Sequence, residues 1–127
     1  MFDSEKAKKF VDAFGDDAYR FAYIITLSKE AAADALRAAF ASLAADPGFD
    51  PDRPDKKKIF FAVYKAAKRS AVAPDKEKIE AEYGQKCEEF YEVASLPPPE
   101  RAKEHLVLYE GYEEKEAEKI LRGAFDE

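Results

Sequence analysis

Six basic side chains between positions 56 and 69 have the type and spacing to bind phosphate groups. The segment 53–70 holds seven bases and one acid, a net charge of +6, whereas the whole chain carries −6. On a helix, positions 58, 65 and 68–69 fall near one face, so their cationic groups could contact successive phosphates. The pattern predicts a nucleic-acid-binding strip made of Lys56, Lys57, Lys58, Lys65, Lys68 and Arg69. The alternative is a solvated helix face whose cations complement the helix dipole near its C-terminus.

The segments on either side of this basic block are acidic. Residues 1–52 carry a net charge of −4, and residues 75–127 carry −8. An acidic chain is a poor general binder of nucleic acid, because neutralising phosphates requires clustered Lys and Arg. A run of glutamates near the C-terminus could mimic nucleic-acid charge or bind a basic partner, or it could be an ordinary solvated helix face. These residues are Glu110, Glu113, Glu114, Glu116 and Glu118.

Catalytic and metal-binding motifs are missing from the sequence. It has no Gly-rich phosphate loop and no His/Cys set with metal-ligand spacing. His105 has no evident ligand or catalytic partner, so the ordinary interpretation is a core or surface histidine, and Cys87 fits an apolar stripe. The aromatic run 19–25 could be a platform for bases, but its continuous apolarity favours the core. We therefore expect a protein that is not an enzyme and that holds no cofactor or metal.

Composition favours an all-α fold. The 127 residues are 46% hydrophobic and 38% charged, with only five glycines, and runs of β-branched residues are missing. A single cysteine fits a reducing compartment. The sequence contains neither the apolar stretch of a signal peptide nor that of a membrane span, so the expected location is cytoplasmic, without membrane contact.

The apolar spacing and capping residues predict where the helices lie. Two helices meeting at Gly15, a third capped by Ser28 and a fourth starting near Asp55 form an N-terminal bundle of residues 1–72. A connecting helix of roughly 76–94 occupies the segment 73–95. The segment 96–127 holds a final pair that opens at the prolines 97–99, turns at Gly111 and ends at Gly123.

Two segments resemble the extracytoplasmic-function group of bacterial sigma factors, which direct RNA polymerase to promoters. Residues 18–23 followed by 28–40 are similar to the second conserved region of that family. Leu96-Pro97-Pro98 with Arg101, Glu110-Gly111 and Ile120-Leu121 are similar to the opening of its fourth region. The resemblance implies a sigma-like bundle, a connecting helix and the first two helices of a helix-turn-helix.

The resemblance also implies roles for single residues, and some expected residue types are absent. Asp34 and Arg37 fall on the helix that docks on polymerase, where Ala33 and Ala38 replace acids and Arg37 replaces a glutamine. The lysine-rich helix corresponds to the promoter-reading element of the family. Ile59 occupies the position of the family's tryptophan and Ala66 that of its asparagine, and these replacements weaken base recognition. Four residues follow Gly123, so we expect no recognition helix.

These observations predict a sigma-factor-like transcription protein with weak or no promoter recognition. Its expected partners are the RNA polymerase core or an anti-sigma-type regulator, while binding of single- or double-stranded promoter DNA is doubtful. The alternative is a protein-interaction or scaffold module that reuses the sigma fold without binding DNA. In either case the final helix pair has an apolar face to cover, so it folds back on the bundle or pairs with a second copy in a homodimer.

Overall fold

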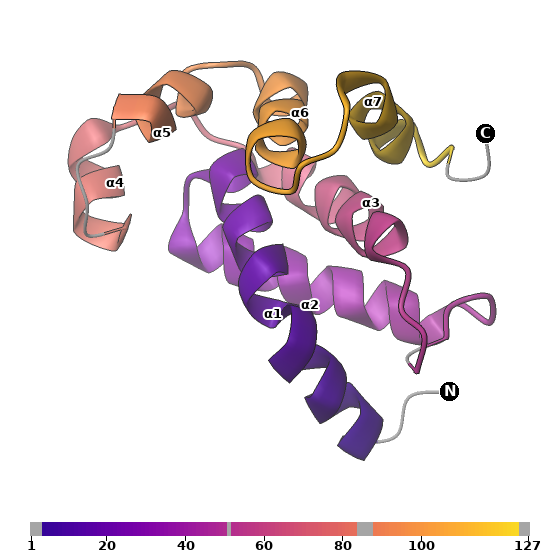
Figure 1. Cartoon of the computed structure of the whole chain (residues 1–127). Coiled ribbons are helices and arrows are strands. Elements are labelled where there is room, and N and C mark those ends of the chain that lie inside the picture. Colours follow the sequence, from indigo (N-terminus) through magenta and orange to yellow (C-terminus); the bar gives the residue numbers. More distant parts are fainter. Residues whose placement is uncertain (1–3, 51, 84–87, 125–127) are drawn as a thin grey trace.

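Helices α1 (Ser4–Thr26), α2 (Lys29–Ala45) and α3 (Lys56–Ala67) pack against one another at the centre of the fold (Figure 1). The computed structural model describes residues 4–50, 52–83 and 88–124. A 3-10 turn, η1 (Lys68–Ser70), extends α3. Four shorter helices follow, namely α4 (Lys76–Tyr83), α5 (Glu88–Ala94), α6 (Pro98–Leu108) and α7 (Glu114–Arg122). Every regular element in these ranges is helical, which confirms the all-α prediction.

Helix α1 corrects the predicted boundary at Gly15. The two helices expected on either side of this glycine form one helix of 23 residues, so the described part of residues 1–72 contains three α-helices and η1 rather than four helices. A glycine inside a helix costs only about 1 kcal/mol relative to alanine. The buried apolar run from Ala18 to Ile25 that follows offsets this cost. Within the described residues, no helix combines the length and apolarity needed to cross a membrane.

A tight turn joins α1 to α2 and fixes their crossing. Leu27 adopts a left-handed conformation, with φ of 56°, and its side chain is buried. Ser28 then caps α2 by accepting a hydrogen bond from the Ala31 main-chain N–H at 3.3 Å, as predicted. The burial of Leu27 compensates for a backbone conformation that non-glycine residues rarely adopt.

The segment predicted as one connecting helix contains α4 and α5 on the side of the molecule opposite α7 (Figure 1). Ile79, in α4, is buried, as are Phe90 and Val93 of α5. Cys87, which was expected in the same apolar stripe, lies outside the described residues.

The final helix pair folds back on the bundle. Helix α6 packs against α1, and α7 packs against α3 and α6. Gly111 and Gly123 both have positive φ, 79° and 73°, which confirms their predicted roles as chain-turning and helix-ending residues. Ala102, Leu106 and Ile120 of this pair belong to the same hydrophobic core as α1–α3. The division into segments 1–72, 73–95 and 96–127 stays a prediction.

Candidate functional site

The six predicted basic residues lie towards the two ends of α3 and in η1, the turn that follows it. Asp55 caps the helix by accepting a hydrogen bond from the Lys57 main-chain N–H at 3.0 Å. About 10 Å of helix separates Lys58 from Lys65, at a rise of about 1.5 Å per residue. We call Lys56, Lys57 and Lys58 the N-terminal lysine group, and Lys65, Lys68 and Arg69 the C-terminal basic group. The side of α3 that faces the core carries Ile59, Phe60, Val63, Tyr64 and Ala67.

Lys56 lies between two carboxylates from different parts of the chain. Its Nζ is 3.5 Å from Asp17 Oδ2 on α1 and 3.8 Å from Glu110 Oε1 in the turn after α6. The Glu110 side chain is only 11% exposed, and its burial raises the pKa of the carboxyl group, while the charge of Lys56 acts in the opposite direction. Lys56 therefore ties α3 to α1 and to the final helix pair.

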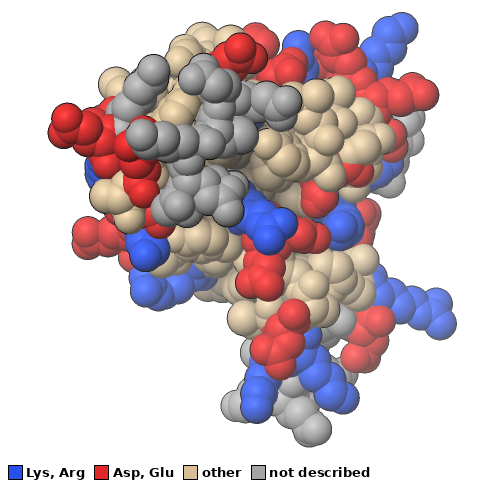
Figure 2. Space-filling model, turned by 60° about the vertical axis from the view of Figure 1, so that its left-hand side comes forward, with Lys and Arg blue, Asp and Glu red and all other residues tan. Residues whose placement is uncertain are grey.

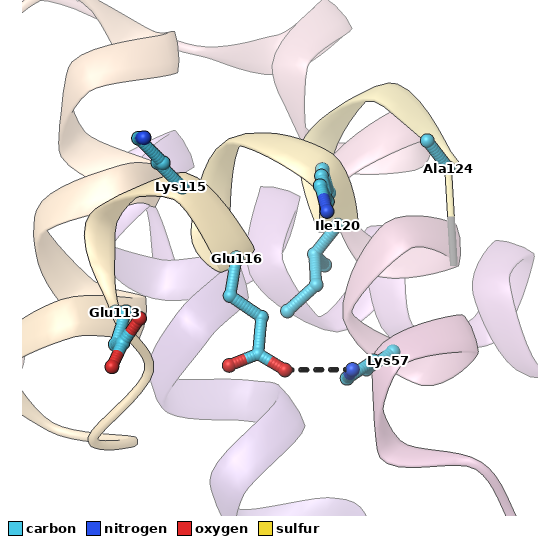
Figure 3. A pocket seen from close by; sticks show the side chains of 7 residues that line it. Lys57, Glu113, Lys115, Glu116, Ile120 and Ala124 are labelled. Carbon is cyan, nitrogen blue, oxygen red and sulfur yellow. Dashed lines mark ion pairs between the residues drawn. The ribbon is translucent and has the colours of Figure 1, made fainter. Parts of the chain in front are cut away.

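Lys57 forms an ion pair with Glu116 of α7. Figure 3 shows the carboxylate extending from α7 toward the ammonium group, and Nζ and Oε1 are 2.7 Å apart. The hydrogen bond with Glu116 raises the pKa of Lys57. This pair lies beside a cavity of about 300 Å³ whose lining mixes both signs of charge. The lining residues are Lys57, Glu113, Lys115, Glu116, Lys119, Ile120 and Ala124.

The remaining cations of α3 and η1 have no carboxylate partner among the described residues. Lys58 Nζ donates a hydrogen bond to the main-chain oxygen of Gly48 at 3.3 Å. The ammonium groups of Lys65 and Lys68 lie 5.8 Å and 5.4 Å from the ring centroids of Phe61 and Tyr64, within the range of a cation–π contact. Arg69 is exposed. The C-terminal basic group is thus the more accessible of the two.

Helix α7 packs against α3 on the side of Lys57. Its Ala117 and Ile120 side chains are buried. Gly123 ends α7 directly over the Phe61 ring, so close that a Cβ atom there would be 3.0 Å from Phe61 Cζ. The contact places the acidic face of α7 close to the start of α3.

Lys103 joins α6 to α7 through two carboxylates of α7, and it also pairs with Glu100 of its own helix. Its Nζ is 3.1 Å from Glu114, 3.7 Å from Glu100 and 3.8 Å from Glu118. The hydrogen bond with Glu114 raises the pKa of Lys103. Four glutamates of the C-terminal run therefore pair with lysines of the same chain: Glu110, Glu114, Glu116 and Glu118. The acidic run is not simply a solvated face.

The predicted polymerase-docking residues lie on a different helix. Asp34 and Arg37 form an ion pair one helical turn apart on α2, and their side chains are 67% and 74% exposed. Helix α2 packs on the bundle through its buried residues Ala32, Ala35, Ala39 and Leu43. Asp34 and Arg37 are therefore accessible, but no contact joins them to the basic residues of α3 in the described part of the chain.

Figure 2 shows one face of the molecule, on the side of α4 and α5, with acidic and basic side chains interspersed. A nucleic-acid-binding face presents a continuous basic patch or stripe. No such stripe is present on the face in this view.

His105 is a core residue. It is 6% exposed and packs between the rings of Phe21 and Tyr109, with centroid distances of 5.4 Å and 5.0 Å. Burial lowers the pKa of His105 to about 4, so the imidazole is neutral at pH 7. This agrees with the ordinary interpretation of the residue. Within the ranges that the structure describes, no group of three or more His, Cys, Asp or Glu side chains is placed to hold a metal ion.

Sequence reasoning missed the pairing between the basic block and the acidic C-terminal segment. One signal was present, because a +6 segment and a −8 segment in one chain can neutralise each other. The individual partners could not be deduced, since Asp17 and Glu110 are distant from Lys56 in sequence and depend on how α6 and α7 cross the bundle. The chain has no match of significant similarity among protein families, curated proteins or solved structures.

Proposed function

We propose that this chain is a helical protein-interaction module whose own glutamates pair with lysines at the start of α3 and so oppose nucleic-acid binding there. The observation that carries the proposal is the pairing of Lys56 with Glu110 and of Lys57 with Glu116, at 3.8 Å and 2.7 Å. Both glutamates belong to the final helix pair, which packs against α1 and α3. The same helices that complete the core therefore bring negative charge to the start of the basic helix.

The pairing opposes phosphate binding in two ways. A phosphate would have to replace a carboxylate that is already in contact with the ammonium group. It would also approach the other glutamates of α7 and be repelled by them. Lys58 already donates a hydrogen bond to the Gly48 main-chain oxygen, so only the C-terminal basic group is available without breaking an ion pair or hydrogen bond of a lysine in the N-terminal lysine group. Three cations give weak, strongly salt-sensitive binding that carries no sequence information, because phosphate contacts do not distinguish bases.

Titration of a fluorescently labelled AT-rich single-stranded DNA tests this proposal directly. The logarithm of the affinity falls with the logarithm of salt concentration by about 0.7 per phosphate contact on single strands. Three contacts therefore give a slope of about −2 and six contacts a slope of about −4. We expect weak binding with the shallower slope. Tight binding at physiological salt with the steeper slope would overturn the proposal.

The second candidate is a sigma-factor-like transcription protein that associates with RNA polymerase or its regulators. The resemblance of residues 18–40 and of the segment starting at Leu96 favours it, as does the exposure of the Asp34–Arg37 pair on α2. Retention of the chain by purified core RNA polymerase is the test. The candidate predicts retention that weakens when Asp34→Lys is introduced and is unchanged by Glu30→Lys, a substitution at another exposed α2 position. Absence of retention counts against it.

A further inference from the structure

A second surface lies on the far side of α6 from α7. Helices α5 and α6 border a groove of about 460 Å³ whose described lining combines apolar and acidic side chains and includes no lysine or arginine. The lining residues are Glu92, Val93, Leu96, Glu104, Leu108 and Tyr109.

The groove carries the two most exposed large hydrophobic residues of the described chain. Leu108 is 61% exposed and Tyr109 is 59% exposed, although they are consecutive and end a helix that packs on the core. Tyr109 is held in place because its ring stacks on His105 at 5.0 Å. Val93 forms the buried floor of the groove, and Leu96 is half-buried. Adjacent exposed apolar side chains over an apolar floor mark a contact surface rather than scattered surface residues.

The charge of the groove indicates what would occupy it. Glu92 of α5 and Glu104 of α6 stand on its two walls, and neither carboxylate is paired with a cation in the described residues. The C-terminal end of α6, where Leu108 and Tyr109 lie, adds the negative end of a helix dipole. On the side shown in Figure 2, uncharged surface is bordered by acidic side chains at several points. An apolar ligand with positive charge at its edges would match both properties.

The geometry points to this groove as the docking site for a basic amphipathic helix of a partner protein. The inference rests on the proposed interaction-module function and adds the class of partner. Such a helix would place apolar side chains at i, i+3 or i+4, and i+7 against Val93, Leu96 and Leu108. Its lysine or arginine side chains would face Glu92 and Glu104. The small size of the groove predicts a micromolar affinity, which is typical of transient contacts.

Two other occupants fit the charges less well. In a symmetric dimer the same patch meets itself, so Glu92 and Glu104 of one copy would approach the same acids of the other. Nucleic acid would meet two carboxylates and no cation among the described lining residues.

Peptide display tests the inference. Random peptides of about 12–16 residues are selected on the immobilised full chain, with counter-selection on a Leu108→Ser variant. We expect enriched peptides with the helical apolar spacing and flanking Lys or Arg. A synthetic copy of one such peptide should bind at least about fivefold more weakly to Leu108→Ser. The matched control is Val72→Ser, which removes an exposed apolar side chain elsewhere, is 42% exposed in the native chain, and should leave binding unchanged.

Charge reversal provides a second, independent readout. The double variant Glu92→Lys/Glu104→Lys should bind the basic peptide at least about tenfold more weakly and should gain affinity for a copy with glutamates at the basic positions. Enriched peptides without basic residues, no enrichment at all, or equal binding to Leu108→Ser would overturn the inference. So would sedimentation showing a dimer that Leu108→Ser dissociates. If only the peptide experiments fail while the DNA titration keeps its shallow slope, the groove assignment is wrong and the masking of α3 stands.

Discussion

The guanidinium of Arg101 donates a hydrogen bond to the main-chain oxygen of Ile25, 2.8 Å away, and a second one to the main-chain oxygen of Leu96 at 2.7 Å. Ile25 lies in the last turn of α1, where carbonyl groups have no partner within their own helix. Arg101 is only 4% exposed, and burial lowers the pKa of its guanidinium, which nevertheless remains charged. The arginine of the proline-rich segment therefore joins the end of α1 to the start of α6.

Loss of this buried cation is expected to destabilise the fold. Arg101→Met leaves two main-chain oxygens without their donor, which costs about 3 kcal/mol of unfolding free energy. Arg101→Lys cannot reproduce both bonds of the planar guanidinium, so it costs about 1–2 kcal/mol. Urea unfolding followed by circular dichroism measures both. The control, Arg69→Met, removes an exposed cation and should change stability by less than about 0.5 kcal/mol. Equal stability of Arg101→Met and Arg69→Met would contradict this role.

Protonation of His105 should lower stability in mild acid. Its pKa is about 4 in the folded chain, against about 6.5 in an unfolded chain. Between these values the unfolded state binds the proton and the folded state does not. The contribution of neutral His105 to the free energy of unfolding is therefore fully present above pH 6.5. It is lost as the pH falls toward 4, by about 1.4 kcal/mol per pH unit.

The comparison of wild type with His105→Phe isolates this effect from the titration of carboxyl groups. The variant keeps an aromatic ring between Phe21 and Tyr109 but has no titrating group at this position. Its free energy of unfolding should fall less steeply than that of the wild type between pH 6.5 and 4. Because the chain contains a single histidine, the NMR titration of the ring protons reads the pKa directly, and a midpoint near 6.5 in the folded chain would refute the prediction.

Gly123 and Gly111 provide a matched pair for the contact between α7 and α3. Both have positive φ, so alanine at either site costs about 1 kcal/mol through backbone strain. At Gly123 a Cβ would also lie 3.0 Å from Phe61, whereas at Gly111 it would meet no atom within 4 Å. We expect Gly123→Ala to cost about 2 kcal/mol and Gly111→Ala about 1 kcal/mol. The additional cost of Gly123→Ala over Gly111→Ala should disappear when Phe61→Ala is combined with Gly123→Ala. Equal costs at the two glycines would show that α7 does not pack on Phe61 as described.

Local chemistry in the sequence predicted the helices well where a capping residue or a glycine marked an end. Ser28 caps α2 as predicted, α3 begins next to Asp55, where a helix start was predicted, and Gly123 ends α7. The helix end predicted at Gly15 was wrong. A single glycine inside a helix costs less free energy than the burial of the apolar residues after it contributes to stability. Composition and periodicity were sufficient for the all-α class.

The candidate site was predictable in its cations but not in their partners. The basic residues of α3 could be listed from the sequence, and the helical spacing placed them away from the core. Whether a lysine meets solvent or a carboxylate depends on long-range packing, as with Lys56 between Asp17 and Glu110. The groove beside Leu108 also depends on long-range packing. It forms between α5 and α6, and no local sequence pattern predicts that these two helices lie next to each other.

The salt dependence of DNA binding in a charge-neutralised variant tests the masking of α3 most directly. The variant Glu110→Gln/Glu116→Gln removes the glutamate charges that pair with Lys56 and Lys57 while it keeps the size of the side chains. Lys57 is then released, whereas Lys56 keeps its pairing with Asp17 at 3.5 Å, so titration with the AT-rich single strand should involve about four cations instead of three. The slope of log affinity against log salt should steepen from about −2 to about −3.

The matched control is Glu77→Gln/Glu80→Gln, which changes the net charge equally on α4, away from α3. It should leave the slope near −2, as in the wild type. Steepening in the Glu110→Gln/Glu116→Gln variant alone is the result that we predict. The same slope in the wild type and in both double variants would contradict the account, because the lysines would then be equally available whether or not α7 carries its charges.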